Sequence, residues 1–295
     1  MKIVNGTENT LMAENSTEYE KKINLCIANQ CFLKCPGCYN NFCKSELISY
    51  DKLRKFLEYA RKNGLEKVTL SGGDPLTRTD IKKIIEKCLE LQLKVNLDTL
   101  GLPFIEDSRV IGSDSTISQF DDIELLKKIS MIGIPMDGSS DEISSKFRKY
   151  KGNLFEKQML ILDFFESHSI PICINTVFHK GNSDDMENIY RIIEKYDCIK
   201  KWQVFQFMAI GPLGKLNEDI YKVEKNTFLA VKQQLEAMNS KNRQIEFKPA
   251  EERACNYMLV NSNGQAYKVD LSNEKTEYGN IGESDSWPKI LKNLC

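Results

Sequence analysis

The chain has 295 residues, with 41 Lys and Arg against 42 Asp and Glu, so its formal net charge is −1. This balance argues against a protein that holds nucleic acid through phosphate contacts, and 41% apolar with 28% charged residues argues against disorder. No apolar stretch is long enough to span a membrane, and the first 20 residues lack the apolar core of a signal peptide, so we expect a cytoplasmic protein.

Short strands rich in Val, Ile and Leu alternate with helical segments from residue 23 to about residue 240. The predicted strands are Ile23–Ala28, Lys67–Ser71, Lys94–Asp98, Met131–Met136, Ile170–Val177 and Trp202–Met208. The predicted helices are Tyr50–Asn63, Thr79–Leu91, Asp121–Lys128, Leu154–Ser167, Ser183–Tyr196 and Glu224–Asn239. The strands recur about every 36 residues, the length of a βαβ unit, which predicts an α/β fold whose parallel sheet forms an open, partial barrel of six units.

After about residue 240 this alternation is predicted to end. Tyr257–Val260 and Gln265–Val269 flank the turn residues Asn261 to Gly264, which predicts a β-hairpin. We therefore divide the chain into a flexible N-terminal segment (1–22), a core (23–240) and a small appendix that covers the core (241–295). Sites in parallel α/β folds gather at the carboxyl ends of the strands, so the search begins there.

Ten cysteines in a chain without a secretion signal predict reduced thiols rather than disulfides. Three of them, Cys31, Cys35 and Cys38, follow the first strand with the spacing C-x3-C-x2-C. Thiolates this close together can hold an iron–sulfur cluster, or a zinc ion that a fourth thiol such as Cys43 completes. Only two histidines are present, which excludes a multi-histidine metal centre.

A second motif, S-G-G-D-P at residues 71–75, ends the second predicted strand. Its glycines allow close backbone approach to a ligand, and its carbonyl and carboxylate groups can accept hydrogen bonds from an ammonium group. Together the two motifs resemble the radical SAM superfamily, with Asp74 in place of the Glu of a G-G-E-P motif. The resemblance implies a partial (β/α)6 barrel and one 4Fe–4S cluster. Its ligands are then Cys31, Cys35 and Cys38, and its fourth iron chelates S-adenosylmethionine (SAM).

The resemblance further implies that SAM is cleaved reductively and that the resulting 5′-deoxyadenosyl radical abstracts a substrate hydrogen. It also implies which residues contact the cofactor: Tyr39, Ser71, Gly72, Gly73, Asp74, Asp98, Asp137, Arg148, Asn175 and Gln206. Arg148 resembles a superfamily arginine that contacts the SAM carboxylate, for which a planar guanidinium is suited. A polar strand end that faces water is the alternative for Asp98, Asp137, Asn175 and Gln206, a surface position is the alternative for Arg148, and a simple turn is the alternative for the S-G-G-D-P motif.

Within the superfamily the chain most resembles the viperin branch, through I-N-T-V at residues 174–177 and W-Q-V-F-Q at residues 202–206. The region from Pro249 to Val260 is also similar to the viperin C-terminal region, where an arginine binds nucleotide phosphates. This implies a nucleoside triphosphate substrate, a viperin-like dehydration, and phosphate contacts by Lys215 and Arg253. Because W-x-V-F-Q also occurs in peptide-modifying relatives, crosslinking or epimerisation of a peptide or sugar is the alternative.

The sequence around Cys255 resembles a SPASM-type extension that has lost its cysteines, so we predict one cluster only. Cys255 is then either a hydrogen-atom donor to a substrate radical or a buried small side chain. The resemblance implies a flavodoxin- or ferredoxin-type electron donor, and we expect a monomer that binds neither membrane nor nucleic acid. A zinc-binding interaction protein is the competing class, which colourless protein with stoichiometric zinc would indicate.

Overall fold

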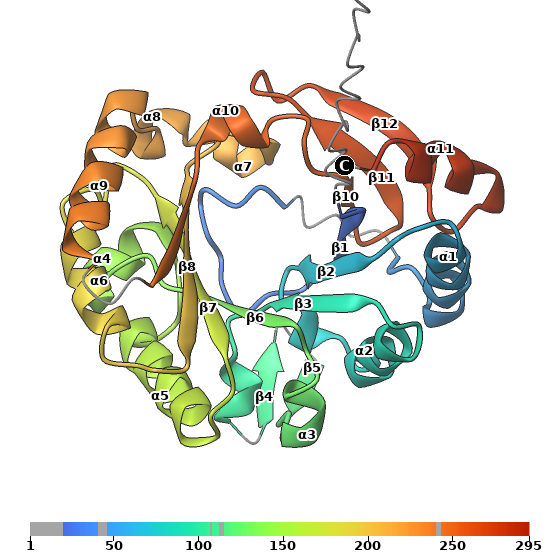
Figure 1. The fold of residues 1–295 in the computed structure, drawn as a ribbon, viewed down its shortest axis with the longest axis horizontal. Helices are drawn as coiled ribbons and strands as arrows, with labels where there is room; N and C mark the ends of the chain where they lie inside the picture. Colours follow the sequence, from blue (N-terminus) through green and yellow to red (C-terminus); the bar gives the residue numbers. More distant parts are fainter. Residues whose placement is uncertain (1–19, 41–45, 107, 112–114, 240–242, 295) are drawn as a thin grey trace, which may run out of the picture.

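The computed structural model describes residues 20–40, 46–106, 108–111, 115–239 and 243–294. Its central feature is a ten-stranded sheet that curves into an open barrel, with helices on the outer side (Figure 1). The strands, in spatial order, are β12 (Lys275–Asn280), β11 (Gln265–Val269), β10 (Leu259–Val260), β1 (Lys22–Ala28), β2 (Lys67–Gly72), β3 (Lys94–Asp98), β6 (Met131–Pro135), β7 (Ile172–Phe178), β8 (Ile199–Gln206) and β9 (Gln244–Lys248).

All neighbouring pairs from β10 through β1 to β9 are parallel, whereas β10, β11 and β12 pair antiparallel. A separate antiparallel pair, β4 (Ser108–Ile111) and β5 (Ser115–Ser118), lies in the connection between β3 and β6. The structure therefore confirms the predicted partial α/β barrel with a C-terminal hairpin.

Helices connect most of the parallel strands and cover the outer face of the sheet. They are α1 (Tyr50–Lys62), α2 (Ile81–Glu90), α3 (Ile123–Leu126), α4 (Asp141–Phe147), α5 (Leu154–Ser167), α6 (Met186–Ile193), α7 (Gly211–Leu216), α8 (Glu218–Tyr221), α9 (Lys225–Met238), α10 (Ala250–Arg253) and α11 (Trp287–Lys292). No helix among the described residues is both long and apolar enough to cross a bilayer.

The helix α1 shows how local sequence fixes these elements. Its N-cap is Ser49, whose side chain accepts a hydrogen bond from the Lys52 amide, and Leu53, Phe56, Leu57 and Ala60 form its buried face. The chain then leaves the helix at Gly64, where φ is +92°, a conformation that glycine adopts without steric cost.

The predicted end of the alternation near residue 240 is wrong, because β9 continues it. This strand pairs parallel with β8, for example through Ile245 opposite Trp202, and forms one edge of the sheet. Its sequence, QIEFK, holds two apolar residues, Ile245 and Phe247, and both are only partly buried. The predicted flexible segment (1–22) lies almost wholly outside the described residues.

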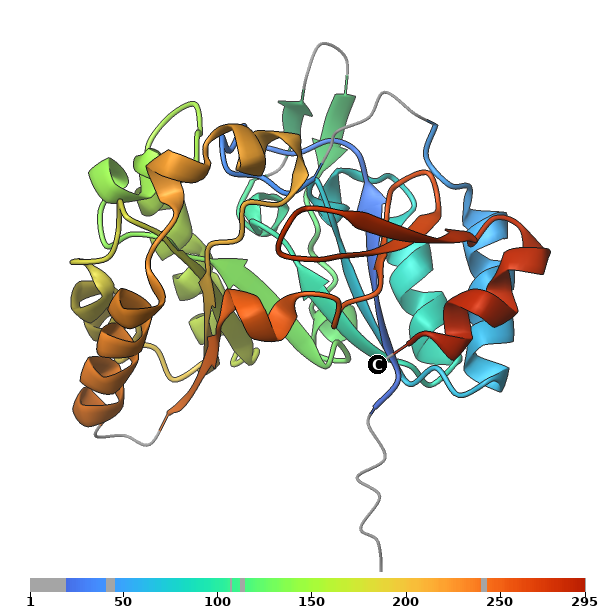
Figure 2. The same cartoon turned by 90° about the horizontal axis from the view of Figure 1, so that it is seen from above.

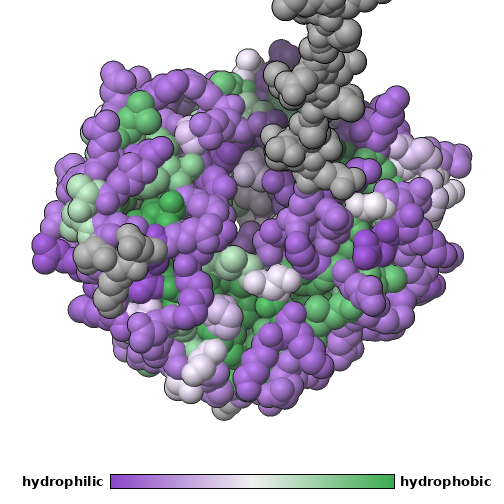
Figure 3. Space-filling view, viewed as in Figure 1, coloured by the Kyte–Doolittle hydropathy of each residue, from purple (hydrophilic) through white to green (hydrophobic). Residues whose placement is uncertain are grey.

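The C-terminal elements complete the barrel on its other edge. β10 pairs with β1, and β11 and β12 extend the sheet beyond the predicted hairpin. Figure 2 shows α10 between this part of the molecule and the part that carries β7 to β9. The face in Figure 3 is mainly hydrophilic and is hollowed near its middle, where Figure 1 shows the barrel interior.

Candidate active site

A cavity of about 350 Å³ lies at the carboxyl ends of the parallel strands. Most of the residues singled out in the sequence line it together: Cys31, Cys35, Cys38, Tyr39, Ser71, Gly72, Gly73, Asp74, Asp98, Arg148, Asn175, Gln206 and Arg253. Side chains that are up to 222 residues apart in the chain, from Cys31 to Arg253, thus meet in one place. Of the other predicted residues, Asp137 lies directly behind Arg148, and Lys215 and Cys255 do not line the cavity.

The three motif cysteines are free thiols on the loop that follows β1. Burial raises the pKa of Cys38 to about 11 and raises the pKa values of Cys31 and Cys35 as well. Metal ligation requires thiolates, and burial disfavours their negative charge. The three cysteines therefore need a strongly cationic centre to stay ionised. The donor set therefore fits an iron–sulfur cluster.

The spacing of the sulfurs also bears on the zinc alternative. Among the described residues, no three His, Cys, Asp or Glu side chains converge as ligands of a single metal ion. A zinc ion needs all its thiolates within about 2.3 Å, whereas each cysteine of a 4Fe–4S cluster binds its own iron at a separate corner. Three cysteines that line one cavity match a cluster in which each thiolate binds its own iron. Cys43, the candidate fourth zinc ligand, lies outside the described residues.

Gly72, the first glycine of the S-G-G-D-P motif, lets the end of β2 lie close to β1. Gly72 has φ +141°, and a Cβ at this position would lie 2.6 Å from the carbonyl oxygen of Ala28. Its carbonyl accepts a hydrogen bond from Asn40 Nδ2, and the Gly73 amide donates to the Ala28 carbonyl at 2.8 Å. The glycine motif and the cysteine loop are thereby joined directly. Asn40 was missed in the sequence because no pattern marks it.

Asp74 lies at the cavity and is also held by hydrogen bonds within the chain. Its buried carboxylate accepts hydrogen bonds from the Leu76 amide (3.0 Å), the Thr99 hydroxyl (2.8 Å) and the Leu100 amide (2.7 Å). These bonds tie the end of β2 to the end of β3 and occupy the carboxylate within the chain. Although burial raises the pKa of Asp74 to about 6, the three donors favour its charged form. The backbone of Gly72 and Gly73 lines the cavity beside this carboxylate.

A polar pair crosses the barrel interior from β3 to β7. Asn175 Nδ2 donates to Asp98 Oδ1 at 3.1 Å, although β6 lies between their strands. The crossing point on β6 is Gly133, where a Cβ would lie 2.2 Å from Asp98 Oδ1 and 2.4 Å from Asn175 Nδ2. Only glycine leaves room for this bond. A glycine in the middle of a strand often marks a close approach between other groups. Gly133 in MIGIP is such a glycine, so the sequence held a signal for this site.

Burial raises the pKa of Asp98 to about 6, which makes a testable prediction for the cluster-free protein. Because the folded-state pKa exceeds the ordinary aspartate value of 3.8, the folded state holds a proton that the unfolded state releases. The contribution of Asp98 to stability is therefore lost as the pH rises from about 4 to about 6. Asp98→Asn should remove this loss, on the order of 2 kcal/mol, in urea unfolding across that range.

The control is Asp121→Asn, at an exposed position whose side chain makes no hydrogen bond among the described contacts. It should show the same pH dependence as the parent protein. If Asp98→Asn also keeps the parent's pH dependence, Asp98 does not hold a proton in the folded state near pH 5, and the effect attributed to burial is absent.

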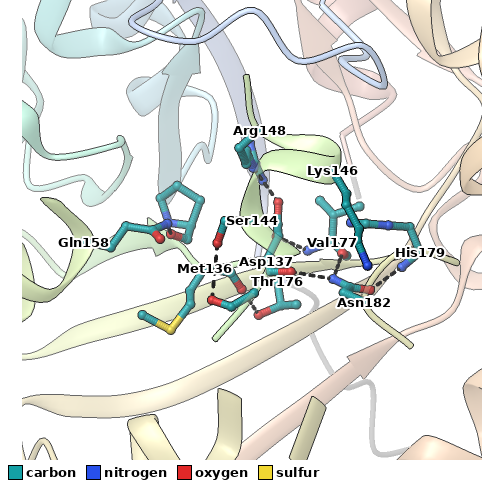
Figure 4. Close-up of polar contacts among 12 residues, drawn as sticks. Met136, Asp137, Ser144, Lys146, Arg148, Gln158, Thr176, Val177, His179 and Asn182 are labelled. Carbon is teal, nitrogen blue, oxygen red and sulfur yellow. Dashed lines mark hydrogen bonds and ion pairs between the residues drawn. The ribbon is translucent and has the colours of Figure 1, made fainter. Parts of the chain in front are cut away.

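Arg148 and Asp137 form a buried ion pair beside the cysteine loop (Figure 4). Arg148 Nε donates to Asp137 Oδ2, and the Val177 amide donates to Oδ1 of the same carboxylate at 2.7 Å. Asn182 Nδ2 donates to the Asp137 carbonyl at 2.9 Å. The positive charge of Arg148 offsets part of the effect of burial on Cys35, and the pKa of that thiol stays raised. Asp137 is fully buried and does not line the cavity, where a cofactor contact was predicted for it. It holds Arg148, which does line the cavity.

Gln206 and Arg253 join the end of β8 to α10. The Gln206 amide group is occupied within the chain, because its nitrogen donates to the Val223 carbonyl and its oxygen accepts from the Ala250 amide. Arg253 donates to the Gln206 carbonyl, and its guanidinium lies 5.5 Å from the centre of the Phe205 ring. Gln206 therefore connects the end of β8 to the start of α10.

The guanidinium of Arg253 lacks an anionic partner among the described residues. Its Nε is buried with no hydrogen-bond partner there, and no described carboxylate forms an ion pair with it. Burial lowers the pKa of Arg253 to about 10, which still leaves it charged at neutral pH. A partly buried cation without a counter-ion can pair with a negatively charged group that enters the cavity.

Two predicted site residues lie outside the cavity. Lys215 is exposed and pairs with Glu218 at 2.7 Å. Cys255 is exposed, with φ +59°, so the expectation that it is buried is wrong. The structure therefore brings neither side chain to the place where Cys31 and Arg253 meet.

Comparisons with known proteins agree with this geometry. A PqqA peptide cyclase of Ruegeria pomeroyi is 25% identical over 164 residues, covering 55% of this chain and 40% of the relative. A probable GTP 3′,8-cyclase of Methanococcus aeolicus is 27% identical over 218 residues, covering 70% of this chain and 66% of the relative. The chain thus spans less than half the length of the peptide cyclase that it matches.

Solved structures share the fold. SuiB of Streptococcus suis bound to its precursor peptide SuiA superposes with a TM-score of 0.69 at 16% identity, over 92% of this chain and 64% of SuiB. The structure anSMEcpe with bound AdoMet gives 0.65 at 17% identity, over 92% of this chain and 82% of that one. These structures share the fold, and none of the proteins named here is a viperin by name. Since the family model named Radical SAM superfamily matches residues 25–193, more than half of the chain, the protein belongs to that superfamily, whose members use a 4Fe–4S cluster and SAM.

Proposed function

We propose that this radical SAM enzyme modifies a peptide, and that a single negatively charged group of the substrate binds Arg253. When bound, the reduced cluster and SAM supply a 5′-deoxyadenosyl radical that abstracts a substrate hydrogen. The chain itself positions the reactants and excludes water, since the cavity lies between the cysteine loop, the strand ends and α10.

The unpaired guanidinium of Arg253 carries the proposal. Among the described residues that line the cavity, the cations are Arg148 and Arg253, and Arg148 is already paired with Asp137. A triphosphate carries several negative charges and needs more than one free cation, whereas one carboxylate is matched by one guanidinium. Because Lys215 lies outside the cavity, the second phosphate contact predicted from the sequence has no support.

The surroundings of Arg253 also favour a peptide. The cavity wall beside it is largely apolar and aromatic, with Phe205, Phe207, Met208, Ile210 and Tyr257. Such a wall suits amino-acid side chains, with one charged group to fix the orientation. A relative named for a peptide and a structural neighbour holding its precursor peptide support this choice. The relative named GTP 3′,8-cyclase supports a nucleotide as the second candidate.

Anaerobic turnover with SAM and a reductant distinguishes the two candidates. Short peptides that carry one Asp or Glu, amide-matched peptides with Asn or Gln, and nucleoside triphosphates are compared by the 5′-deoxyadenosine they produce. We expect the acidic peptides to stimulate most. Arg253→Gln should raise KM for them by about 10- to 100-fold, the usual effect of losing one charge-assisted hydrogen bond.

Lys215→Gln is the matched control, since this lysine is exposed and already paired with Glu218, and its KM should stay unchanged. Stimulation by a nucleoside triphosphate with none by any peptide would replace the proposal with the nucleotide. An Arg253→Gln enzyme with the parent KM for acidic peptides would remove Arg253 as the anion site.

A further inference from the structure

A phenylalanine ring from α4 fills the space beside Gly37, the residue that precedes Cys38 in the cysteine loop. A Cβ at Gly37 would lie 2.3 Å from Cε2 of Phe147 and 3.1 Å from Cε2 of Phe207. The φ angle of Gly37 lies outside the left-handed region that favours glycine. The Phe147 ring, rather than the backbone, therefore excludes a side chain between Cys35 and Cys38.

Aromatic neighbours hold the Phe147 ring in this place. His179 stacks on it with the ring centres 5.0 Å apart, and Tyr221 and Phe207 meet it edge-on at 5.0 and 6.2 Å. These four buried residues, here called the aromatic cluster, come from α4, the end of β7, the end of β8 and α8. Because each contact favours a particular ring orientation, the position of Phe147 is fixed from several elements at once.

His179 takes part in the aromatic cluster as a neutral ring. Burial lowers the pKa of His179 to about 4, and its Nδ1 accepts a hydrogen bond from the Gly181 amide at 3.0 Å. The Tyr221 hydroxyl donates to the Lys146 carbonyl at 3.0 Å, which ties the end of α4 to α8. The aromatic cluster is therefore uncharged near neutral pH and packs behind the cysteine loop without attracting water.

The aromatic cluster reaches the active-site cavity. Phe147 and Phe207 line the cavity together with Cys35, Gly37 and Cys38. A closely packed ring at this place leaves no room for water beside Gly37 and limits the movement of the loop. Both effects act on a cluster bound by these cysteines, because solvent exposure tunes its reduction potential and contacts around the ligands help to retain the metal.

We propose that Phe147 is a positioning residue for the cluster: its ring occupies the place of a side chain at Gly37, fixes Cys35 and Cys38, and keeps water away from the cluster between them. The reduced cluster carries one more negative charge than the oxidised cluster, so water stabilises the reduced form more. Excluding water therefore keeps the reduction potential low, as transfer of an electron to the SAM sulfonium requires. This inference does not depend on the substrate class.

The test removes the ring and then returns it from the other side of the contact. Phe147→Ala, Phe147→Leu and the double variant Gly37→Phe/Phe147→Ala are reconstituted anaerobically with iron and sulfide. Loss of visible absorbance gives the rate at which EDTA removes the iron, and a titration followed by EPR gives the midpoint potential. Phe147→Ala should lose iron about 10- to 100-fold faster than the parent, the usual effect of losing a contact around the metal ligands.

The midpoint potential of Phe147→Ala should shift to more positive values, because water enters beside the cluster. Phe147→Leu, which fills more of the space, should lie between Phe147→Ala and the parent in both measurements. In the double variant the new ring at position 37 refills the space that Phe147 leaves. It should therefore lose iron more slowly than Phe147→Ala and return toward the parent potential.

Phe228→Ala is the matched control, because Phe228 is buried, packs against Phe178 and Phe247, and does not line the cavity. It should lower the unfolding midpoint in urea but keep the parent's rate of iron loss and midpoint potential. Parent values of both quantities in Phe147→Ala would overturn the proposal. A double variant that loses iron as fast as Phe147→Ala would also overturn it, since Phe147 would then support only the fold. If Phe147→Ala binds no iron, the iron contents of Phe147→Leu and the double variant give the same decision.

Discussion

Single replacement of Cys31, Cys35 or Cys38 by Ala should eliminate SAM cleavage down to the level of a blank without enzyme. Each thiolate holds one iron, so an alanine leaves that iron without a protein ligand and the cluster is not retained. The measurements are iron and sulfide per protein after anaerobic reconstitution, and 5′-deoxyadenosine formed with SAM and dithionite. This is the largest effect expected for any substitution in the chain.

Cys255→Ala is the matched control for the three cluster variants, because Cys255 is exposed and outside the cavity. It should keep its iron, its SAM cleavage and the nature of the product. A change of product with unchanged SAM cleavage would restore Cys255 as the hydrogen donor predicted from the sequence. Full iron content and turnover in any of the three cluster variants would contradict the assignment of the ligands.

Asp74→Ala should produce the largest loss of stability at the site. The substitution leaves the amides of Leu76 and Leu100 and the Thr99 hydroxyl without their acceptor in a buried place. Unpaired buried donors of this kind lower the free energy of unfolding by about 3 kcal/mol in total, and the end of β2 is freed from the end of β3. We expect a lower unfolding midpoint in urea and weaker SAM binding, because Gly72 and Gly73 lose their fixed position.

Two further variants sharpen this prediction. Asp74→Asn keeps one oxygen acceptor but turns an amide NH2 toward the remaining donors, so its stability should fall between that of the parent and that of Asp74→Ala. Asp121→Ala, at an exposed position, should match the parent in both measurements. If Asp74→Ala keeps the parent's unfolding midpoint, the carboxylate is not the tie between the two strands, and its predicted role as a ligand of the SAM ammonium group regains support.

The comparison of predicted and observed strands shows where sequence patterns suffice. β3 has the predicted bounds, and β1, β2, β6 and β7 differ from prediction by one or two residues at their ends, whereas β8 begins three residues before its predicted start. β9 was missed, although its sequence QIEFK alternates in the same way as the sequence KVNLD of β3. The alternation alone therefore does not separate a short edge strand from a polar connecting segment.

By itself, the sequence determined the cysteine triplet, the glycine motif and the βα alternation, and with them the superfamily. Each of these is a local pattern, in which the backbone between a few residues limits where their side chains can lie. The tertiary structure alone decided that Asp74 is occupied by the end of β3, that Gly133 lets Asp98 reach Asn175, and that Arg253 has no anionic partner among the described residues. These facts depend on which groups meet after strands far apart in the chain pack together, and no spacing along the chain encodes such meetings.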